Sequence, residues 1–342
     1  MTNWKTYKLG DILNFRRGHD LPKTEMVNGE IPVAGSNGVI GYHNVSTPIE
    51  PCITIGRSGN VGTPYIYAKC WAHNTVLYVD DFKGNDPLYL YYLLKTIPLA
   101  SYGGGSAVPT LNRNHIHPIE IKHTPSLAEQ RRIAGILGAI DDKIENNRRI
   151  NDNLEQQAQA LYKQWFVDNR SDDWETKKLS EFFNVVTGKK DANFSTKDGS
   201  YPFFTCSQDV LKAPDYSFEG AAILLAGNGD FNVKRYIGKF EAYQRTYVLI
   251  PFDRKYHSFL YLTIKHYLQE ITGGSRGSVI KFITKGNIAD FEVALPQINI
   301  DDKLAVLDSL YQTIDGNMTE NENLATLRDS LLPKLMNGEI KL

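Results

Sequence analysis

The chain has 342 residues, of which 42% are hydrophobic and 23% charged, and its formal net charge is −1. This length exceeds what one hydrophobic core usually organises and excludes a single small module, and no apolar run approaches the roughly 18–20 residues of a membrane span. The opening residues lack the apolar stretch of a secretion signal, and Cys52, Cys70 and Cys206 show neither metal-ligand spacing nor a disulfide framework, so we expect a cytoplasmic protein without membrane contact.

Residues 1–125 have the pattern of a mixed α/β domain. Short runs of β-branched and aromatic residues at 52–55, 64–68 and 74–79 are separated by Gly, Pro and Asn, which is typical of strands joined by turns. The stretch Leu88–Lys95 places Leu90, Leu93 and Leu94 on one side and predicts a helix.

Residues 126–171 predict one long helix. Ser126 and Glu129 have the spacing of a capping box at its start, and Asp168–Asn169 marks its end. Between them, a stripe with alternating spacings of four and three residues indicates a helix that packs against a partner. The stripe consists of Ile133, Leu137, Ile140, Ile144, Asn147, Asn151, Leu154, Ala158, Leu161 and Trp165.

Residues 172–296 repeat the first domain. The segment 4–14 recurs at 174–184, Ile31–Val33 matches Tyr201–Phe203, and 53–59 matches 223–229, each at an offset of 170 residues. Such matches in the same order indicate an internal duplication, so we expect a second mixed α/β domain, with a helix over Phe259–Gln269.

Residues 297–342 repeat the helical segment and carry the chain's net negative charge, with eight acidic and four basic side chains. Pro333 is expected to bend or interrupt the last turns, and Asn337–Gly338 to end the helix. The second stripe consists of Leu304, Leu307, Tyr311, Ile314, Met318, Asn321, Ala325, Arg328, Leu332 and Leu335.

The predicted fold class is α+β: two mixed α/β domains in tandem repeat, separated by two long helices that pair as an antiparallel coiled coil with pseudo-twofold symmetry. About thirty helical residues span roughly 45 Å, a suitable length for a spacer. The polar stripe residues Asn147 and Asn321 would fix the register of the pair. The alternative is that each helix packs on its own domain.

The helical segments resemble the specificity subunits of type I restriction-modification enzymes. Residues 125–133, 140–144 and 161–168 are similar to the conserved region that follows a target recognition domain in that family, and 331–340 is similar to its C-terminal signature. Residues 55–62 and 105–111 resemble looser recognition-domain motifs. The second domain departs from them, since no arginine occupies the position of Arg57.

The resemblance implies a protein that performs no chemistry and binds no cofactor. Residues 1–125 and 172–296 would each read one half of an asymmetric, interrupted target in double-stranded DNA. Residues 126–171 and 297–342 would set the spacing and dock two methyltransferase subunits, which bind S-adenosylmethionine and methylate adenine. Restriction or translocase subunits are further partners of the family.

Side chains suited to DNA contact cluster in loops of both domains. Arg, Asn, Gln, Ser and Thr read base edges, whereas Lys, Arg and the amides of Gly-rich loops bind phosphate. The candidates are Ser36, Asn37, Arg57, Ser58, Asn60, His73, Asn74, Tyr102 and Ser106 in the first domain, and Lys189, Lys190, Ser207, Gln208, Asn228, Asn232, Gln244, Arg245, Ser275, Arg276 and Ser278 in the second. Arg16 and Arg17 follow the first strand of the first domain, as the lysine pair follows that of the second, and are further candidates for phosphate contact.

Each candidate also has a structural interpretation. The arginines can form salt bridges or bind loop carbonyls, Asn in a loop often stabilises an Asx-turn, and the lysine pair can be simply solvated. His115 and His117 alternate as on a strand with no Cys, Asp or Glu at ligand spacing, so we expect no metal site.

Two other functions compete with this interpretation. A methyltransferase acting alone is disfavoured because Asp86–Tyr89 lacks the second proline of the usual catalytic motif and no Gly-rich cofactor loop follows the first strand. A scaffold that binds ligands other than DNA, with two lobes on a coiled coil, remains the alternative.

Overall fold

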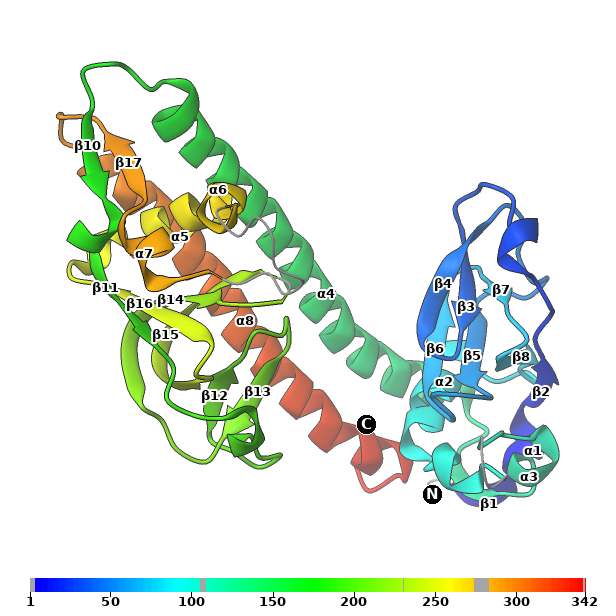
Figure 1. The fold of residues 1–342 in the computed structure, drawn as a ribbon. Helices are drawn as coiled ribbons and strands as arrows, with labels where there is room; N and C mark the ends of the chain where they lie inside the picture. The colour runs from blue at the N-terminus through cyan, green and yellow to red at the C-terminus, as the bar shows by residue number, and fades with distance from the viewer. Residues whose placement is uncertain (1–3, 105–108, 230, 274–282, 341) are drawn as a thin grey trace. The chain divides into compact units, whose positions relative to one another are not determined.

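The computed structural model describes residues 4–104, 109–229, 231–273, 283–340 and 342. It divides into two compact units (Figure 1): Met1–Asn146 with Glu320–Leu342, and Asn147–Thr319. Each unit combines one lobe with segments of two long helices, α4 (Leu127–Lys163) and α8 (Asp301–Met336). The two predicted long helices are therefore confirmed. Among the described residues, no helix has the length and apolar character that crossing a membrane requires.

The described residues of the first lobe form three small sheets. The largest has the antiparallel order β2-β8-β5-β6, the second has the order β4-β3-β7, and the third pairs β1 with β9. Its strands are β1 (Lys5–Lys8), β2 (Asn14–Arg17), β3 (Ile31–Gly35), β4 (Gly38–His43), β5 (Cys52–Gly56), β6 (Pro64–Tyr67), β7 (Trp71–Ala72), β8 (Val76–Asp81) and β9 (Glu120–His123).

Helix α2 (Pro87–Thr96) closes the core of the first lobe and confirms the predicted helix. Asp86 caps it, since the Tyr89 amide donates to the Asp86 carboxylate at 2.9 Å, and Pro87 occupies the first turn, where its missing N–H costs nothing. Leu90, Leu93 and Leu94 are buried as the spacing predicts. Two short helices complete the lobe, α1 (Leu9–Ile12) and α3 (Arg113–Ile116).

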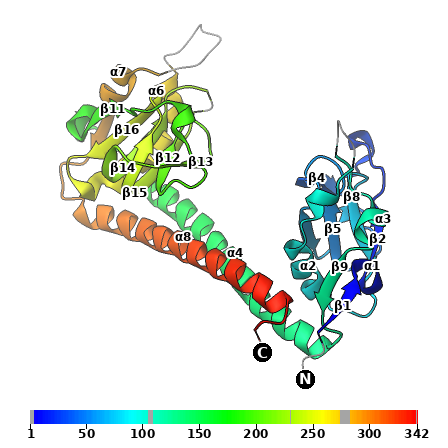
Figure 2. The ribbon, with the colours of Figure 1, turned by 90° about the horizontal axis from the view of Figure 1, so that it is seen from below.

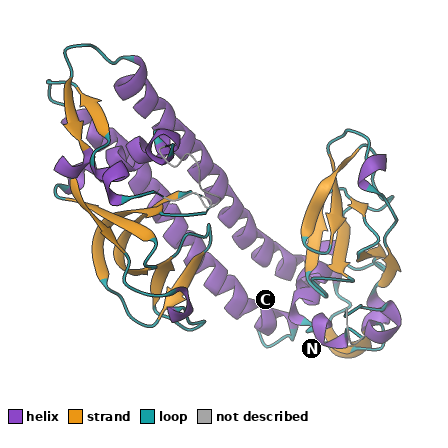
Figure 3. Cartoon of the chain, in the orientation of Figure 1, coloured by secondary structure: helices purple, strands orange, loops and turns teal. Residues whose placement is uncertain are grey.

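The second lobe has one larger sheet, whose strands are orange in Figure 3. Its strand order is β11-β16-β14-β15-β12-β13. Most neighbours are antiparallel, and β12 pairs with β15 in parallel. The strands are β10 (Glu175–Lys178), β11 (Phe183–Thr187), β12 (Tyr201–Phe204), β13 (Val210–Ala213), β14 (Phe218–Ala226), β15 (Val233–Ala242), β16 (Thr246–Pro251) and β17 (Glu292–Leu295). The helices are α5 (His257–His266), α6 (Leu268–Thr272) and α7 (Lys285–Ala289).

The duplication is visible in the pairing of the first and last strands of each lobe. Strand β1 pairs antiparallel with β9, and β10 pairs antiparallel with β17 in the same way. The lobes differ in the middle, because the β14–β15 pair is long enough to join in one sheet the strands that form separate sheets in the first lobe.

In the first unit, the helical segments pack antiparallel and also against the lobe. Arg328 of α8 donates to the Asp141 carboxylate of α4 at 2.7 Å, and Tyr92 of α2 donates to the same carboxylate at 2.6 Å. Nearer the middle of both helices, Lys143 pairs with Glu320 at 3.2 Å. Arg328, which interrupts the apolar stripe, is therefore held by an ion pair.

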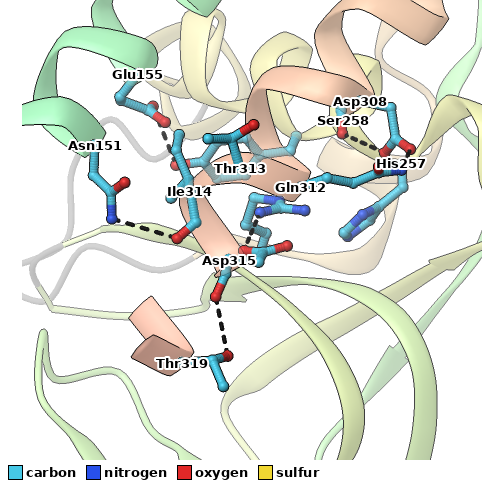
Figure 4. A network of polar contacts seen from close by, with 12 residues as sticks. Asn151, Glu155, His257, Ser258, Asp308, Gln312, Thr313, Ile314, Asp315 and Thr319 are labelled. Atoms are coloured by element: carbon cyan, nitrogen blue, oxygen red, sulfur yellow. Dashed lines mark hydrogen bonds and ion pairs between the residues drawn. The ribbon is translucent and has the colours of Figure 1, made fainter. Parts of the chain in front are cut away.

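In the second unit, a polar network ties α4, α8 and the lobe together (Figure 4). Asn151 of α4 donates to the Ile314 carbonyl of α8 at 3.3 Å. Glu155 of α4 pairs with Lys265 of α5 at 2.6 Å, and Arg235 of β15 pairs with Asp315 of α8 at 2.7 Å. The segments of α4 and α8 in this unit run side by side in both ribbon views (Figures 1 and 2).

The stripe residues serve both helix pairing and lobe packing. Ile133, Leu137, Leu332 and Leu335 belong to the core of the first lobe, as Leu307, Tyr311 and Ile314 belong to the core of the second. The long helices therefore pair with each other, as the coiled-coil interpretation predicts, and also pack on the lobes, as the alternative predicts. Ile144 and Asn147 are buried, Leu154 and Leu161 are half-buried against the second core, and Ile140 and Asn321 are half-buried.

One predicted stripe residue is wrong. Met318 is 55% exposed, because Asn317 occupies the contact with α4 instead and donates to the Asn151 side chain at 2.8 Å. An α-helix drifts by about 20° per heptad relative to a strict seven-residue repeat, which rotates a neighbouring position into the contact. Pro333 does not interrupt the helix either, since α8 continues through it to Met336.

Candidate nucleic-acid interface

A common backbone framework brings the candidate loops of the first lobe together. The Gly18 amide, after β2, donates to the Val76 carbonyl at 3.0 Å, and the Arg57 amide, after β5, donates to the Thr75 carbonyl at 2.8 Å. The Leu111 amide then donates to the Arg57 carbonyl at 2.8 Å. Three loops that are distant in sequence therefore meet at one end of the β2-β8-β5 sheet.

The second lobe repeats this framework with other side chains. The Gly188 amide donates to the Thr246 carbonyl at 2.9 Å, and the Gly227 amide donates to the Arg245 carbonyl at 2.9 Å. The Ile283 amide donates to the Gly227 carbonyl at 3.1 Å. These hydrogen bonds match those of the first lobe pair by pair, so the loops that carry the candidate residues occupy equivalent places in both lobes.

The first residue of each framework, Gly18 or Gly188, has to be glycine because its backbone lies very close to a carbonyl group. A Cβ atom would lie 2.1 Å from the His73 carbonyl oxygen if added to Gly18, and 2.2 Å from the Ala242 carbonyl oxygen if added to Gly188. Both distances are far below van der Waals contact, and a backbone carbonyl cannot yield as a flexible side chain does. Glycine therefore allows this loop to reach the sheet end.

We expect Gly188→Ala to destabilise the protein by about 1–3 kcal/mol, since the added methyl overpacks a rigid site. The loop with Lys189 and Lys190 would be displaced from the sheet end. Gly316→Ala is a matched control, because a Cβ there meets nothing within 4 Å and Ala favours the helix interior by about 0.5–1 kcal/mol. Urea unfolding measures both; equal midpoints for the two variants would contradict the assigned crowding.

The first-lobe candidates lie around this framework. Ser36 and Asn37 form the turn between β3 and β4, and a Cβ on Gly59 would lie 3.3 Å from the Ser36 hydroxyl. The Arg57 side chain donates weakly to the Asn74 carbonyl at 3.5 Å. Ser58 and Thr110 form an isolated antiparallel β-bridge. Thr110 is also bridged to Gly104, which lies just beyond Tyr102.

Some of these side chains already hold the loops in place. The Asn60 side-chain oxygen accepts from the Thr63 hydroxyl at 3.0 Å, and Asn74 donates to the Asp20 carboxylate. The His73 ring contacts the Thr75 hydroxyl at 3.1 Å. Burial lowers the pKa of His73, which favours its neutral form, although nearby Asp20 acts in the opposite direction. Direct DNA contact by these residues stays a prediction.

An arginine-lined cavity of about 410 Å³ opens at the same end of the first lobe. Arg16 and Arg17 reach it from β2, Arg57 from the loop after β5, and Arg113 from α3. The remaining lining residues are uncharged: Leu77, Thr110, Leu111 and Asn112. The pKa of neighbouring His117 is lowered first by burial and then by Arg113 and Lys83, as expected in a positive local field.

Arg113 is a residue that the sequence interpretation missed. The sequence feature that could have identified it is a basic residue two positions after Leu111. The Leu111 amide donates to the Arg57 carbonyl. Its guanidinium donates to the Phe15 carbonyl at 3.3 Å, which directs the α3 side chain toward β2.

The second-lobe candidates are also brought together. The Gln244 side chain donates to the Asp191 carboxylate at 2.6 Å, and the Gln244 backbone amide donates to the Lys190 carbonyl at 2.9 Å. The Lys189 ammonium lies 5.2 Å from the centre of the Phe218 ring, and that of Lys190 lies 4.4 Å from the Phe194 ring. Asn228 follows Gly227 directly, and Arg245 lies in the turn before β16.

The loop after β12 completes this cluster. The Cys206 thiol donates to the Arg245 carbonyl at 3.4 Å, and exposed Ser207 and Gln208 follow it. Asn232 is 8% exposed and donates to the Cys206 carbonyl at 2.9 Å, so its side chain supports the loop.

Lys234 is a second residue that the sequence interpretation missed. Its ammonium donates to the Ser207 carbonyl and to the Asn232 side chain, and burial lowers its pKa. It lies on β15, where strand periodicity alone gave no reason to select it.

Ser106, Ser275, Arg276 and Ser278 lie outside the described residues. Within the described part of the chain, no group of three or more His, Cys, Asp or Glu side chains is placed to hold a metal ion.

The sequence matches the family model of the type I restriction modification DNA specificity domain twice, over residues 1–156 and 171–326. The chain belongs to the type I restriction-modification DNA specificity family. The two tandem matches account for the internal duplication, and the predicted family is confirmed.

Individual members of the type I specificity family show the same relationship. The chain is 42% identical to the EcoDI specificity subunit of Escherichia coli over 173 residues, an alignment that covers 49% of this chain and 39% of that protein. It is 27% identical to the MjaIX specificity subunit of Methanocaldococcus jannaschii over 304 residues, covering 74% of this chain and 69% of the relative.

The fold is shared with a solved member of the type I specificity family. The crystal structure of the specificity subunit from M. genitalium matches with a TM-score of 0.69 at 18% identity, over 98% of this chain and 96% of that one. The predicted combination of tandem mixed α/β domains with long helices is therefore the fold of the family.

Proposed function

We propose that this chain gives a type I restriction-modification enzyme its DNA sequence specificity, with each lobe reading one half of an asymmetric, interrupted target. The observation that carries this proposal is the repeated loop framework, which presents different side chains in the two lobes. Ser58 in the first lobe corresponds to Asn228 in the second. Different hydrogen-bonding side chains at equivalent places would select different bases.

The helices would set the separation of the two half-sites and dock two methyltransferase subunits, which bind S-adenosylmethionine and methylate adenine. Restriction or translocase subunits would join the same assembly in the cytoplasm. The chain itself would be non-catalytic and without a cofactor. Exposed apolar side chains on both helices, including Ile136, Ile150 and Val306, supply surface for such docking. The alternative of a scaffold for other ligands lacks support from the family match.

A map of methylated bases in host DNA, with and without this gene, tests the proposal. The strain must keep an active partner methyltransferase gene. We expect methyladenine to disappear from one interrupted, asymmetric motif when the gene is deleted and to return when the intact gene is restored. An unchanged map in the presence of active methyltransferase would refute the proposed role.

A further inference from the structure

The arginines that line the cavity are mostly replaced by other residues at the matching positions of the second lobe. Strand pairing fixes the correspondence, because Arg17 pairs with Leu77 in the first lobe and Thr187 pairs with Tyr247 in the second. Arg16 likewise corresponds to Val186.

The other two arginines also have defined counterparts. The backbone hydrogen bonds match Arg57 with Gly227. The Arg57 amide donates to the residue before β8 and the Gly227 amide to the residue before β16. The carbonyls of both residues accept from the segment that precedes α3 or α7. Buried Ile116 of α3 matches buried Ile288 of α7, so Arg113 corresponds to Lys285. Only one of the four cationic positions therefore carries a positive charge in the second lobe.

Within the first lobe, the contacts of Arg17, Arg57 and Arg113 leave the charge of these three side chains largely uncompensated. Arg57 and Arg113 donate to the backbone carbonyls of Asn74 and Phe15, which are neutral acceptors. Arg17 faces Asp20 at 3.9 Å, with both side chains more than half exposed, so that pair is weak. Four guanidinium groups around one cavity repel each other, and an anion between them would offset this repulsion.

We propose that this cavity binds a phosphodiester group of the DNA backbone and anchors the first lobe to DNA without reading sequence. The inference rests on the proposed function. A guanine edge is read by one arginine in a bidentate pair, whereas several guanidinium groups on one oxyanion are typical of phosphate recognition. A cavity of about 410 Å³ has the size of a small-ligand site and accommodates a phosphate with its neighbouring sugar. The first lobe thus carries an electrostatic anchor that the matching positions of the second lobe do not provide.

Binding of the full-length chain to a fluorescent DNA duplex, measured by anisotropy over a range of salt concentrations, tests this inference. We expect Arg17→Gln and Arg113→Gln each to weaken binding about tenfold at 0.1 M salt, because each removes one charge-assisted hydrogen-bonding group. The slope of log affinity against log salt should fall by about 0.9 for each phosphate that a variant no longer neutralises. Lys285→Gln is the matched control in the second lobe and should leave the slope unchanged, while Arg113→Lys should retain most of it.

The outcomes separate the inference from the proposed function. A flat salt response of the unmodified chain would overturn the proposed function as well. A steep response that Arg17→Gln and Arg113→Gln leave unchanged would overturn the anchor alone. Urea unfolding of each variant verifies that the fold is intact.

Two further measurements distinguish a DNA phosphate from other ligands. Sodium phosphate should inhibit DNA binding more strongly than sodium chloride at equal ionic strength, because it competes for the same guanidinium groups, and Arg113→Gln should remove this difference. Phosphate that stabilises the unmodified chain thermally without displacing DNA would assign the cavity to a free anion instead. The methylated motif in a strain carrying Arg113→Gln should be the same sequence at lower occupancy, and an altered motif would show base reading in place of anchoring.

Discussion

Replacing residues 172–296 with the second lobe of another family member is expected to change one half of the methylated target and to leave the other half unchanged. The pairing of β10 with β17 makes this exchange feasible, because Glu175 lies opposite Leu295 and the two ends of the lobe are therefore adjacent. The described second-lobe candidates all lie between these strands.

The donor lobe must preserve the packing against the helices. Phe259 packs on Tyr162 and Phe166 of the first long helical segment, and Arg235 pairs with Asp315. Methylated-base mapping of strains with each chimera gives the readout, and the reciprocal exchange of residues 1–125 is the control, which should change the opposite half. Simultaneous change of both halves in either chimera would refute independent reading by the two lobes.

The second large effect is expected from Phe259→Ala, which should lower the free energy of unfolding by about 3–5 kcal/mol. Phe259 is 1% exposed, and its ring centre lies 4.9 Å from that of Phe166 and 5.7 Å from that of Tyr162. Truncation leaves a cavity where α5 meets the end of α4, and neighbouring aromatic rings cannot collapse into it fully. Methylation in the cell should fall as the folded population decreases.

Phe252→Ala provides a control with the same chemical change at an exposed position. Phe252 is 63% exposed, so its truncation should alter stability by less than about 0.5 kcal/mol. Urea unfolding followed by circular dichroism compares the two variants. A similar destabilisation in both would contradict the assignment of Phe259 to the core that joins helix and lobe.

The elements that were predicted best are those with a local periodic signal. The helix over Leu88–Lys95 and the long helices follow from the spacing of their apolar residues, because that spacing repeats with each turn. The duplication required no structural knowledge, as it is a comparison of the chain with itself. Met318 shows the limit, since the strict seven-residue spacing selected it but the neighbouring Asn317 makes the contact.

The candidate site was predicted in part. Loop composition selected Arg57, Lys190 and Gln244, and backbone hydrogen bonds do hold their loops at the sheet end of the respective lobe. Arg113 and Lys234 escaped because a short helix and a strand carry them, and their approach to these loops depends on contacts between segments distant in the chain.

Periodicity and self-similarity were thus sufficient to predict two related lobes and two long helices, since both are encoded in neighbouring or repeated residues, and the family was recognised from its resemblance to the motifs of the helical segments. The meeting of the loops at a sheet end, the cavity between four arginines and the burial of Asn232 follow from long-range pairing. Such pairing depends on the free energy of the whole fold, including the backbone hydrogen bonds that place Gly18 and Gly188 against a carbonyl, and a local pattern does not contain it.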